Sequence, residues 1–130
     1  MGTELEFYDN LIKKCKSIFN LKKKEYGNSW VSMRLSSLTD QIKIKILRID
    51  NILNKKKNLV GESIENDIIG AINYCIISII KFQSKDCEFE NVENLYDEIC
   101  FDQKELFIKK NHDYNSAWKV IRTTSIIDMI

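Results

Sequence analysis

The sequence of 130 residues contains no proline and only four glycines. Because apolar residues also recur at the helical spacing of about 3.6 residues, this scarcity predicts an all-α fold. The most apolar run, residues 68–82, is too short to span a bilayer and is interrupted by Asn73, Ser78 and Lys81. Nothing near the start is typical of a signal peptide. We therefore expect a cytoplasmic protein with no membrane partner.

Signals for structural metal and for nucleic acid are also weak. The four cysteines show no CxxC spacing, and His112 is the single histidine, so no zinc signature is present. The net charge of +1 gives no overall attraction to nucleic acid, which is not an expected partner. Lysines do concentrate in residues 13–24 and 43–57. Such runs usually form solvated helix faces, and phosphate binding is the alternative.

One motif occurs twice. Residues 8–42 align without a gap to residues 96–130, and about a third of the aligned positions are identical. Tyr8, Tyr26, Trp30 and Arg34 return as Tyr96, Tyr114, Trp118 and Arg122. The repetition predicts a tandem helical repeat packed as one bundle of about five helices. Its expected parts are a first helical unit at 1–83, a linker at 84–91 and a second unit at 92–130 packed on the first. The second unit is expected to be incomplete, which leaves a homo-oligomer open.

Local patterns place the helices and their ends. Helices are expected at residues 5–24, 37–57, 62–82 and 92–110, with a short one from Ser125. Residues 62–82 are apolar on nearly every side, which predicts the central helix. Gly27 and its counterpart Asn115 suit a positive φ after a helix end. Ser37 and Asp40 are expected to form a capping box at the start of the second helix.

Several of these blocks together resemble a known family. They are E-Y-G-N-S-W, S-L-T-D-Q-I and I-N-Y in the first copy and K-N-H-D-Y-N-S-A-W in the second. They are similar to a bacterial and phage family, first described as a domain of unknown function, called nucleotide modification associated domain 1. The resemblance implies an all-helical tandem unit and an association with nucleotide-modification genes. Gly70 departs from the family, in which an acid often stands one turn before the Asn-Tyr pair.

Two functions compete on this sequence. The first is nucleotide binding or processing, for which the resemblance and a faint likeness to all-α nucleoside triphosphate pyrophosphatases argue. The candidate nucleotide- or phosphate-binding residues are Arg34, Lys45, Arg48, Tyr26 and Asn73. If Mg²⁺ takes part, its candidate ligands are Glu62, Glu65 and Asp40, since carboxylates suit that cation. The second-copy counterparts are Tyr114, Trp118, Arg122 and Asp128. The alternative is a non-catalytic interaction or structural module, in which the charged side chains join the helices. Trp30 is interpreted as a packing residue, with ligand stacking as the alternative.

Overall fold

The computed structural model describes residues 2–27, 29–55, 59, 61, 63–83 and 92–130. Its elements are α1 (Gly2–Tyr26), η1 (Ser29–Ser32), α2 (Leu35–Lys55), α3 (Ile64–Gln83), α4 (Val92–Asp113), η3 (Ala117–Lys119) and α5 (Thr123–Met129), where η marks a short 3₁₀ helix. These residues contain no β-strand, so the predicted all-α fold is confirmed. The linker predicted at 84–91 lies outside the described residues.

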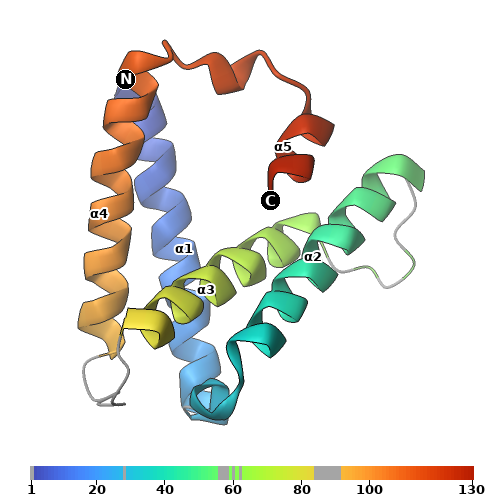
Figure 1. Cartoon of the computed structure of the whole chain (residues 1–130), viewed down its shortest axis with the longest axis vertical. Helices are drawn as coiled ribbons and strands as arrows, with labels where there is room; N and C mark the ends of the chain where they lie inside the picture. Colours follow the sequence, from blue (N-terminus) through green and yellow to red (C-terminus); the bar gives the residue numbers. More distant parts are fainter. Residues whose placement is uncertain (1, 28, 56–58, 60, 62, 84–91) are drawn as a thin grey trace.

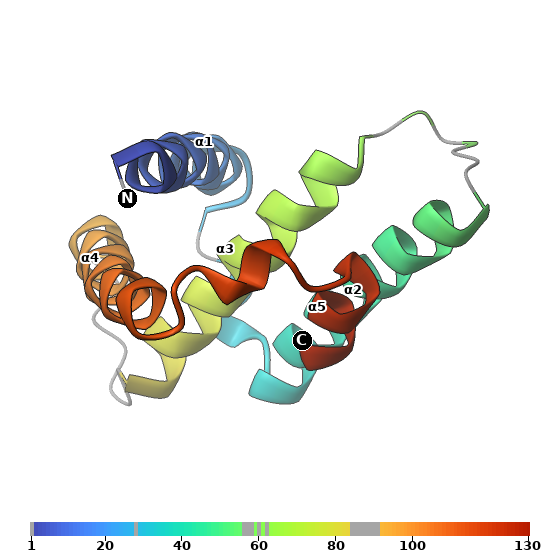
Figure 2. The ribbon, with the colours of Figure 1, turned by 90° about the horizontal axis from the view of Figure 1, so that it is seen from above.

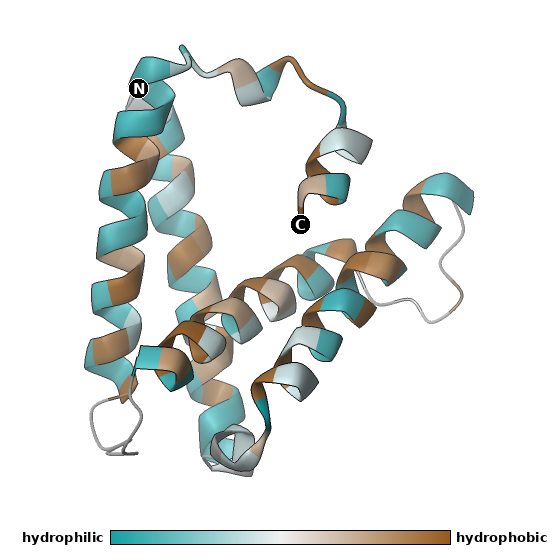
Figure 3. Ribbon diagram, in the orientation of Figure 1, coloured by the Kyte–Doolittle hydropathy of each residue, from teal (hydrophilic) through white to brown (hydrophobic). Residues whose placement is uncertain are grey.

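The helices pack as a bundle around α3. Helices α1 and α4 run side by side in opposite directions, and α3 crosses them (Figure 1). Seen from above, α1 and α4 lie on one side of α3, and α2 and α5 lie on the other (Figure 2). Because α3 contacts α1, α2 and α4, the prediction that this apolar helix is central is confirmed. Figure 3 shows α3 as hydrophobic over much of its length, whereas polar positions dominate α1 and α4.

The core joins the first three helices to α4. Its buried members are Phe19, Trp30, Leu38, Ile76, Ile77, Ile80, Val92, Tyr96, Ile99 and Cys100. Trp30 is 8% exposed and belongs to this core, as expected for a packing residue. None of the described helices combines the length and the apolarity that a bilayer-spanning segment needs.

The ends of the helices follow the two copies of the motif. Gly27 (φ 63°) and Asn115 (φ 49°) both take the left-handed conformation, as predicted. The capping box predicted at Ser37 is wrong, because α2 begins two residues earlier, at Leu35. The carbonyl of Arg34 accepts the amides of Ser37 and Leu38 at 3.0 and 3.1 Å, which places Ser37 inside the first turn. Helix α5 likewise begins after Arg122, two residues before the predicted start.

Helices α1 and α4 contact each other through pairs of equivalent residues. Lys16 binds Asp97 at 2.8 Å, and Lys104 binds Asp9 at 2.9 Å. The ring of Phe19 lies 4.9 Å from that of Tyr96, and the ring of Tyr8 lies 5.7 Å from that of Phe107. In both pairs of contacts, the residues of the second contact are the counterparts of those of the first, because aligned positions of the two copies differ by 88 in number. Such reciprocity is typical of an interface with two-fold symmetry.

Two buried thiols between these helices predict a loss of stability at alkaline pH. Burial raises the pKa of Cys15 and of Cys100 from the ordinary 9.0 to about 11. The unfolded chain therefore releases these protons at lower pH than the folded chain. As the pH rises from 9 to 11, this deprotonation of the unfolded chain lowers the free energy of unfolding. We expect each thiol to lower the free energy of unfolding by about 1.4 kcal/mol per pH unit in this range. Urea titrations of the protein and of a Cys15→Ala, Cys100→Ala variant at pH 8 and pH 10 measure this, and equal slopes for both proteins would contradict it.

Candidate functional site

A cavity of about 640 Å³ lies where the end of α1, η1 and one face of α3 meet, and Lys45 of α2 also lines it. Its lining residues are Ile18, Phe19, Leu21, Lys22, Lys23, Gly27, Ser29, Trp30, Met33, Lys45, Asn66, Asp67, Gly70, Asn73, Tyr74 and Ile77. The volume lies within the range of sites for small molecules and cofactors. Apolar and aromatic side chains with a few polar groups are also the composition that such sites have.

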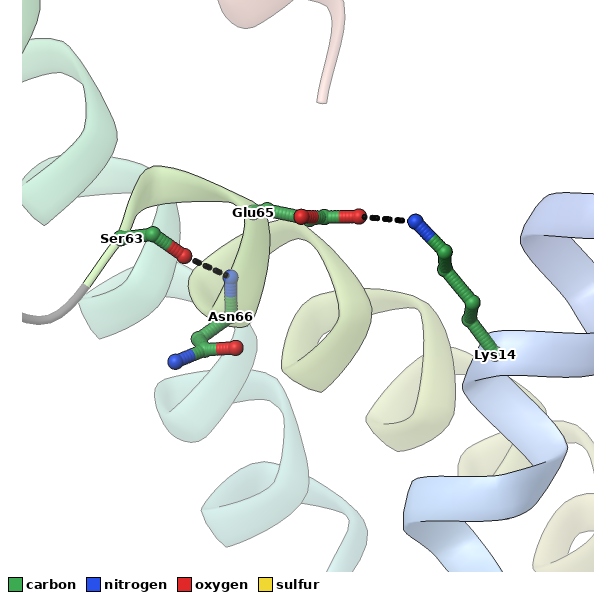
Figure 4. A network of polar contacts seen from close by, with 4 residues as sticks. All are labelled: Lys14, Ser63, Glu65 and Asn66. Atoms are coloured by element: carbon green, nitrogen blue, oxygen red, sulfur yellow. Dashed lines mark hydrogen bonds and ion pairs between the residues drawn. The ribbon is translucent and has the colours of Figure 1, made fainter.

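One stripe of α3 supplies much of the wall. Asn66, Gly70, Asn73 and Ile77 follow one another at intervals of three or four residues, so they share one face of the helix. Ser63 caps the start of this helix, because its hydroxyl oxygen accepts a hydrogen bond from the backbone N–H of Asn66 at 3.4 Å (Figure 4). The helix thereby presents Asn66 in its first turn and Asn73 two turns later on the same side.

Lys45 reaches the cavity across Gly70. A Cβ atom on Gly70 would come within 2.6 Å of Cε and 2.9 Å of Cδ of Lys45, so a larger residue here would displace the lysine. The ammonium of Lys45 lies 6.0 Å from the centre of the Tyr74 ring, at the outer limit of a cation–π contact. Where the family often has an acid, this chain thus has a glycine that makes room for the stem of a lysine.

Asp67 and Arg48 form the most buried ion pair of the region. The carboxylate of Asp67, which lines the cavity, is 9% exposed and accepts a hydrogen bond from Nη1 of Arg48. A buried carboxylate needs such a partner, because its transfer out of water is otherwise very costly. The guanidinium of Arg48 thus binds a carboxylate of the lining, although Arg48 itself does not line the cavity.

Asn73 is held by two hydrogen bonds from different helices. Tyr96 of α4 donates its hydroxyl proton to Oδ1 at 2.6 Å, and Nδ2 donates to the carbonyl oxygen of Cys15 in α1 at 3.0 Å. Asn73 is 7% exposed and Tyr96 is 0% exposed. Burial also raises the pKa of Tyr96 far above its ordinary value, so the phenol stays protonated and acts as the donor. The amide plane is consequently fixed in one orientation.

The structure brings together only some of the residues proposed from the sequence. Lys45 and Asn73 line the cavity, and Arg48 bonds to the lining residue Asp67. Arg34 is exposed at the start of α2 and is not part of the lining. The side chain of Tyr26 lies outside the described residues.

Of the proposed metal ligands, neither Glu65 nor Asp40 lines this cavity. Glu65 pairs with Lys14 of α1 at 3.0 Å on the surface (Figure 4), and Asp40 is exposed in α2. Glu62 lies outside the described residues. Within the part of the chain that the structure describes, no three His, Cys, Asp or Glu side chains form a group that could hold a metal ion.

The second-copy counterparts lie away from the cavity. Tyr114, Arg122 and Asp128 are exposed, and none of them belongs to its lining. Trp118 is 44% exposed, where Trp30 is buried, and its indole N–H donates to Oδ1 of Asn111 at 2.6 Å. The two copies of the motif thus share a left-handed residue after the helix, at Gly27 and Asn115, but they differ in the burial of the tryptophan.

Lys22, Lys23 and Gly70 also line the cavity, although they were not among the candidate ligand-binding residues. The two lysines belong to the run 13–24, for which a solvated helix face was expected and phosphate binding was the alternative. Gly70 was noted only as a departure from the family. A glycine in the interior of a helix costs about 1 kcal/mol relative to alanine, so its presence there was the available signal for a close contact.

Comparison with known proteins agrees with the resemblance seen in the sequence. Residues 22–82 match the family model described as nucleotide modification associated domain 1. No curated protein and no solved structure gives a match. The matched segment contains most of the cavity lining, from Lys22 at the end of α1 to Ile77 in α3. Residues 22–82 of this chain are thus similar to the nucleotide modification associated domain 1 family.

Proposed function

We propose that the cavity binds a nucleotide, with the phosphate at its lysine-lined rim. The observation that carries the proposal is the charge of the lining. Lys23 and Lys45 contribute two positively charged side chains to the lining. Among the described lining residues Asp67 is the one carboxylate, and Arg48 neutralises it. The excess of positive charge favours an anion, and ammonium groups are common ligands of phosphate.

The remainder of the lining suits a flat, partly apolar group. Trp30, Met33 and Tyr74 offer aromatic and polarizable surface, and Asn73 offers a hydrogen-bonding amide. A nucleobase combines an apolar face with polar edges, so it matches this composition better than a simple anion does. Binding is the function proposed here, and no residue is assigned to a chemical step.

Calorimetric titration of the protein with nucleosides and with their mono-, di- and triphosphates tests the proposal. We expect the nucleotides to bind at least about tenfold more tightly than the matching nucleosides, because charge-assisted contacts to phosphate add 1.5–3 kcal/mol each. The affinity should fall as the salt concentration rises, since the lysines are near the surface. Repeating the titration with Mg²⁺ and assaying pyrophosphate release tests processing in the same samples. Equal affinity for nucleosides and nucleotides, or no binding of either, would contradict the proposal.

Replacing Gly70 by alanine separates binding from stability. The new Cβ would occupy the space of the Lys45 stem, while alanine favours the helix by up to about 1 kcal/mol over glycine. We expect the Gly70→Ala variant to unfold at the same urea concentration as the parent or a higher one, but to bind nucleotide about fivefold more weakly, because Lys45 is displaced. Gly2→Ala is the matched control, since nothing lies within 4 Å of a Cβ at that helical glycine. Unchanged affinity in Gly70→Ala would show that the position of Lys45 does not matter.

A further inference from the structure

The orientation of the Asn73 amide has a consequence for which ligands fit. The amide has two N–H donors and an oxygen with two lone pairs. One N–H is donated to the Cys15 carbonyl, and Oδ1 accepts the proton of Tyr96. A rotation of the amide by 180° would set Oδ1 against the Cys15 oxygen, so these contacts exclude it. The second N–H of the Asn73 side chain takes part in neither of these two hydrogen bonds, and Asn73 lines the cavity.

The depth of Asn73 indicates which part of a nucleotide it meets. Asn73 is 7% exposed, and the ring of its partner Tyr96 packs at a tilt against Phe19, another lining residue. Lys22 is exposed, and Lys23 and Lys45 are partly exposed. A phosphate is costly to bury and remains with the lysines near solvent, whereas a base can enter the deeper, apolar part. The base edge is therefore the part of the ligand that approaches Asn73.

We propose that Asn73 donates its remaining N–H to an acceptor atom on the edge of the base, and that Tyr96 is the positioning residue that aims it. This inference rests on the proposed nucleotide-binding function and extends it to base recognition. Tyr96 belongs to α4, outside the family-matched residues 22–82. Helix α4 thus contributes to the selectivity of a cavity that the matched segment builds. A fixed donor discriminates more strongly than a mobile one, because a ligand without the acceptor leaves it unpaired.

The test compares Tyr96→Phe with Tyr8→Phe. The two tyrosines occupy equivalent positions in the two copies of the motif. The hydroxyl of Tyr96 joins α4 to α3. The hydroxyl of Tyr8 joins α1 to α4 by donating to the Cys100 carbonyl at 2.9 Å. Tyr8 does not line the cavity. The probes are the common nucleoside 5′-monophosphates and ribose 5-phosphate, which has the phosphate and the sugar but no base. The readout is the ratio of the affinities for mononucleotide and for ribose 5-phosphate.

We expect Tyr96→Phe to lower this ratio about fivefold while the affinity for ribose 5-phosphate stays within twofold, and Tyr8→Phe to leave the ratio unchanged. A merely structural loss would weaken both ligands equally. The NMR signals of the Asn73 side-chain amide supply a second readout in the unmodified protein, in case Tyr96→Phe does not fold. They should shift with mononucleotide and remain in place with ribose 5-phosphate. An unchanged ratio in Tyr96→Phe, or an Asn73 amide that does not respond to mononucleotide, would overturn the inference while nucleotide binding itself stands. If the unmodified protein binds no nucleotide, both proposals fail.

Discussion

Replacement of Arg48 by alanine should destabilise the protein by about 3 kcal/mol and lower its melting temperature by about 10 °C. The reason is that the Asp67 carboxylate would then be buried without its cationic partner. The Asp67 side chain is 9% exposed and would lose the guanidinium with which it forms an ion pair. The expected loss lies at the low end of the range for a broken buried ion pair, because the Arg48 side chain keeps 24% of its exposure and water can partly replace it.

Two further variants identify the buried charge as the cause. Lys14→Ala removes a cation from the exposed pair with Glu65 and should cost less than about 0.5 kcal/mol. Adding Asp67→Asn to Arg48→Ala removes the unpaired charge and should recover part of the loss. Urea titrations of the four proteins measure these differences. A stability of Arg48→Ala within 0.5 kcal/mol of the parent would mean that the pair contributes little, as surface pairs do.

This result also decides how a binding defect in Arg48→Ala should be interpreted. On the sequence alone, Arg48 is a candidate for direct contact with phosphate. In the structure its guanidinium bonds to Asp67, and Asp67 lines the cavity. Loss of Arg48 would thus expose an anion to an uncompensated carboxylate in the wall. Weaker nucleotide binding by Arg48→Ala would follow from this repulsion even if Arg48 never touches the ligand.

The fold was predictable because it depends on local signals. Apolar residues at the helical spacing identified the central helix α3, and the Tyr-Gly and Tyr-Asn pairs identified two helix ends with a left-handed residue. The start of α2 was missed because Ser37 and Asp40 form a plausible capping box, whereas the chain extends the helix to Leu35 without a side-chain cap of that kind. Helix caps contribute only about 1 kcal/mol, so tertiary packing can override them.

The site was only partly predictable because its parts meet through tertiary contacts. Lys45 and Asn73 were proposed from the family resemblance, and the structure places both at the cavity. Their partners could not be read from the sequence. Tyr96 is 23 residues from Asn73, and Cys15 is 58 residues away from it. No periodicity links residues on different helices, so the role of Tyr96 becomes visible only when α4 is packed against α1 and α3.

Removal of the Lys45 charge should have the largest effect on nucleotide binding. Lys45→Met keeps a flexible, apolar stem that can lie across Gly70, and it deletes the ammonium group alone. We expect the affinity for nucleoside monophosphates to fall about 30-fold, which corresponds to about 2 kcal/mol for one charge-assisted contact. The stability should change by less than about 1 kcal/mol, because the contact with Tyr74 is long and Lys45 is only partly buried.

Lys43→Met is the matched control for this change. Lys43 lies on the same helix two residues earlier, is exposed and does not line the cavity. Both variants lose one positive charge, so any effect of net charge on a phosphate ligand is the same in the two proteins. Calorimetric titration should therefore show a loss in Lys45→Met and an affinity within twofold of the parent in Lys43→Met. Equal losses in both would mean that the lysines act through the general field of the surface, and the cavity would then no longer be the place where the phosphate binds.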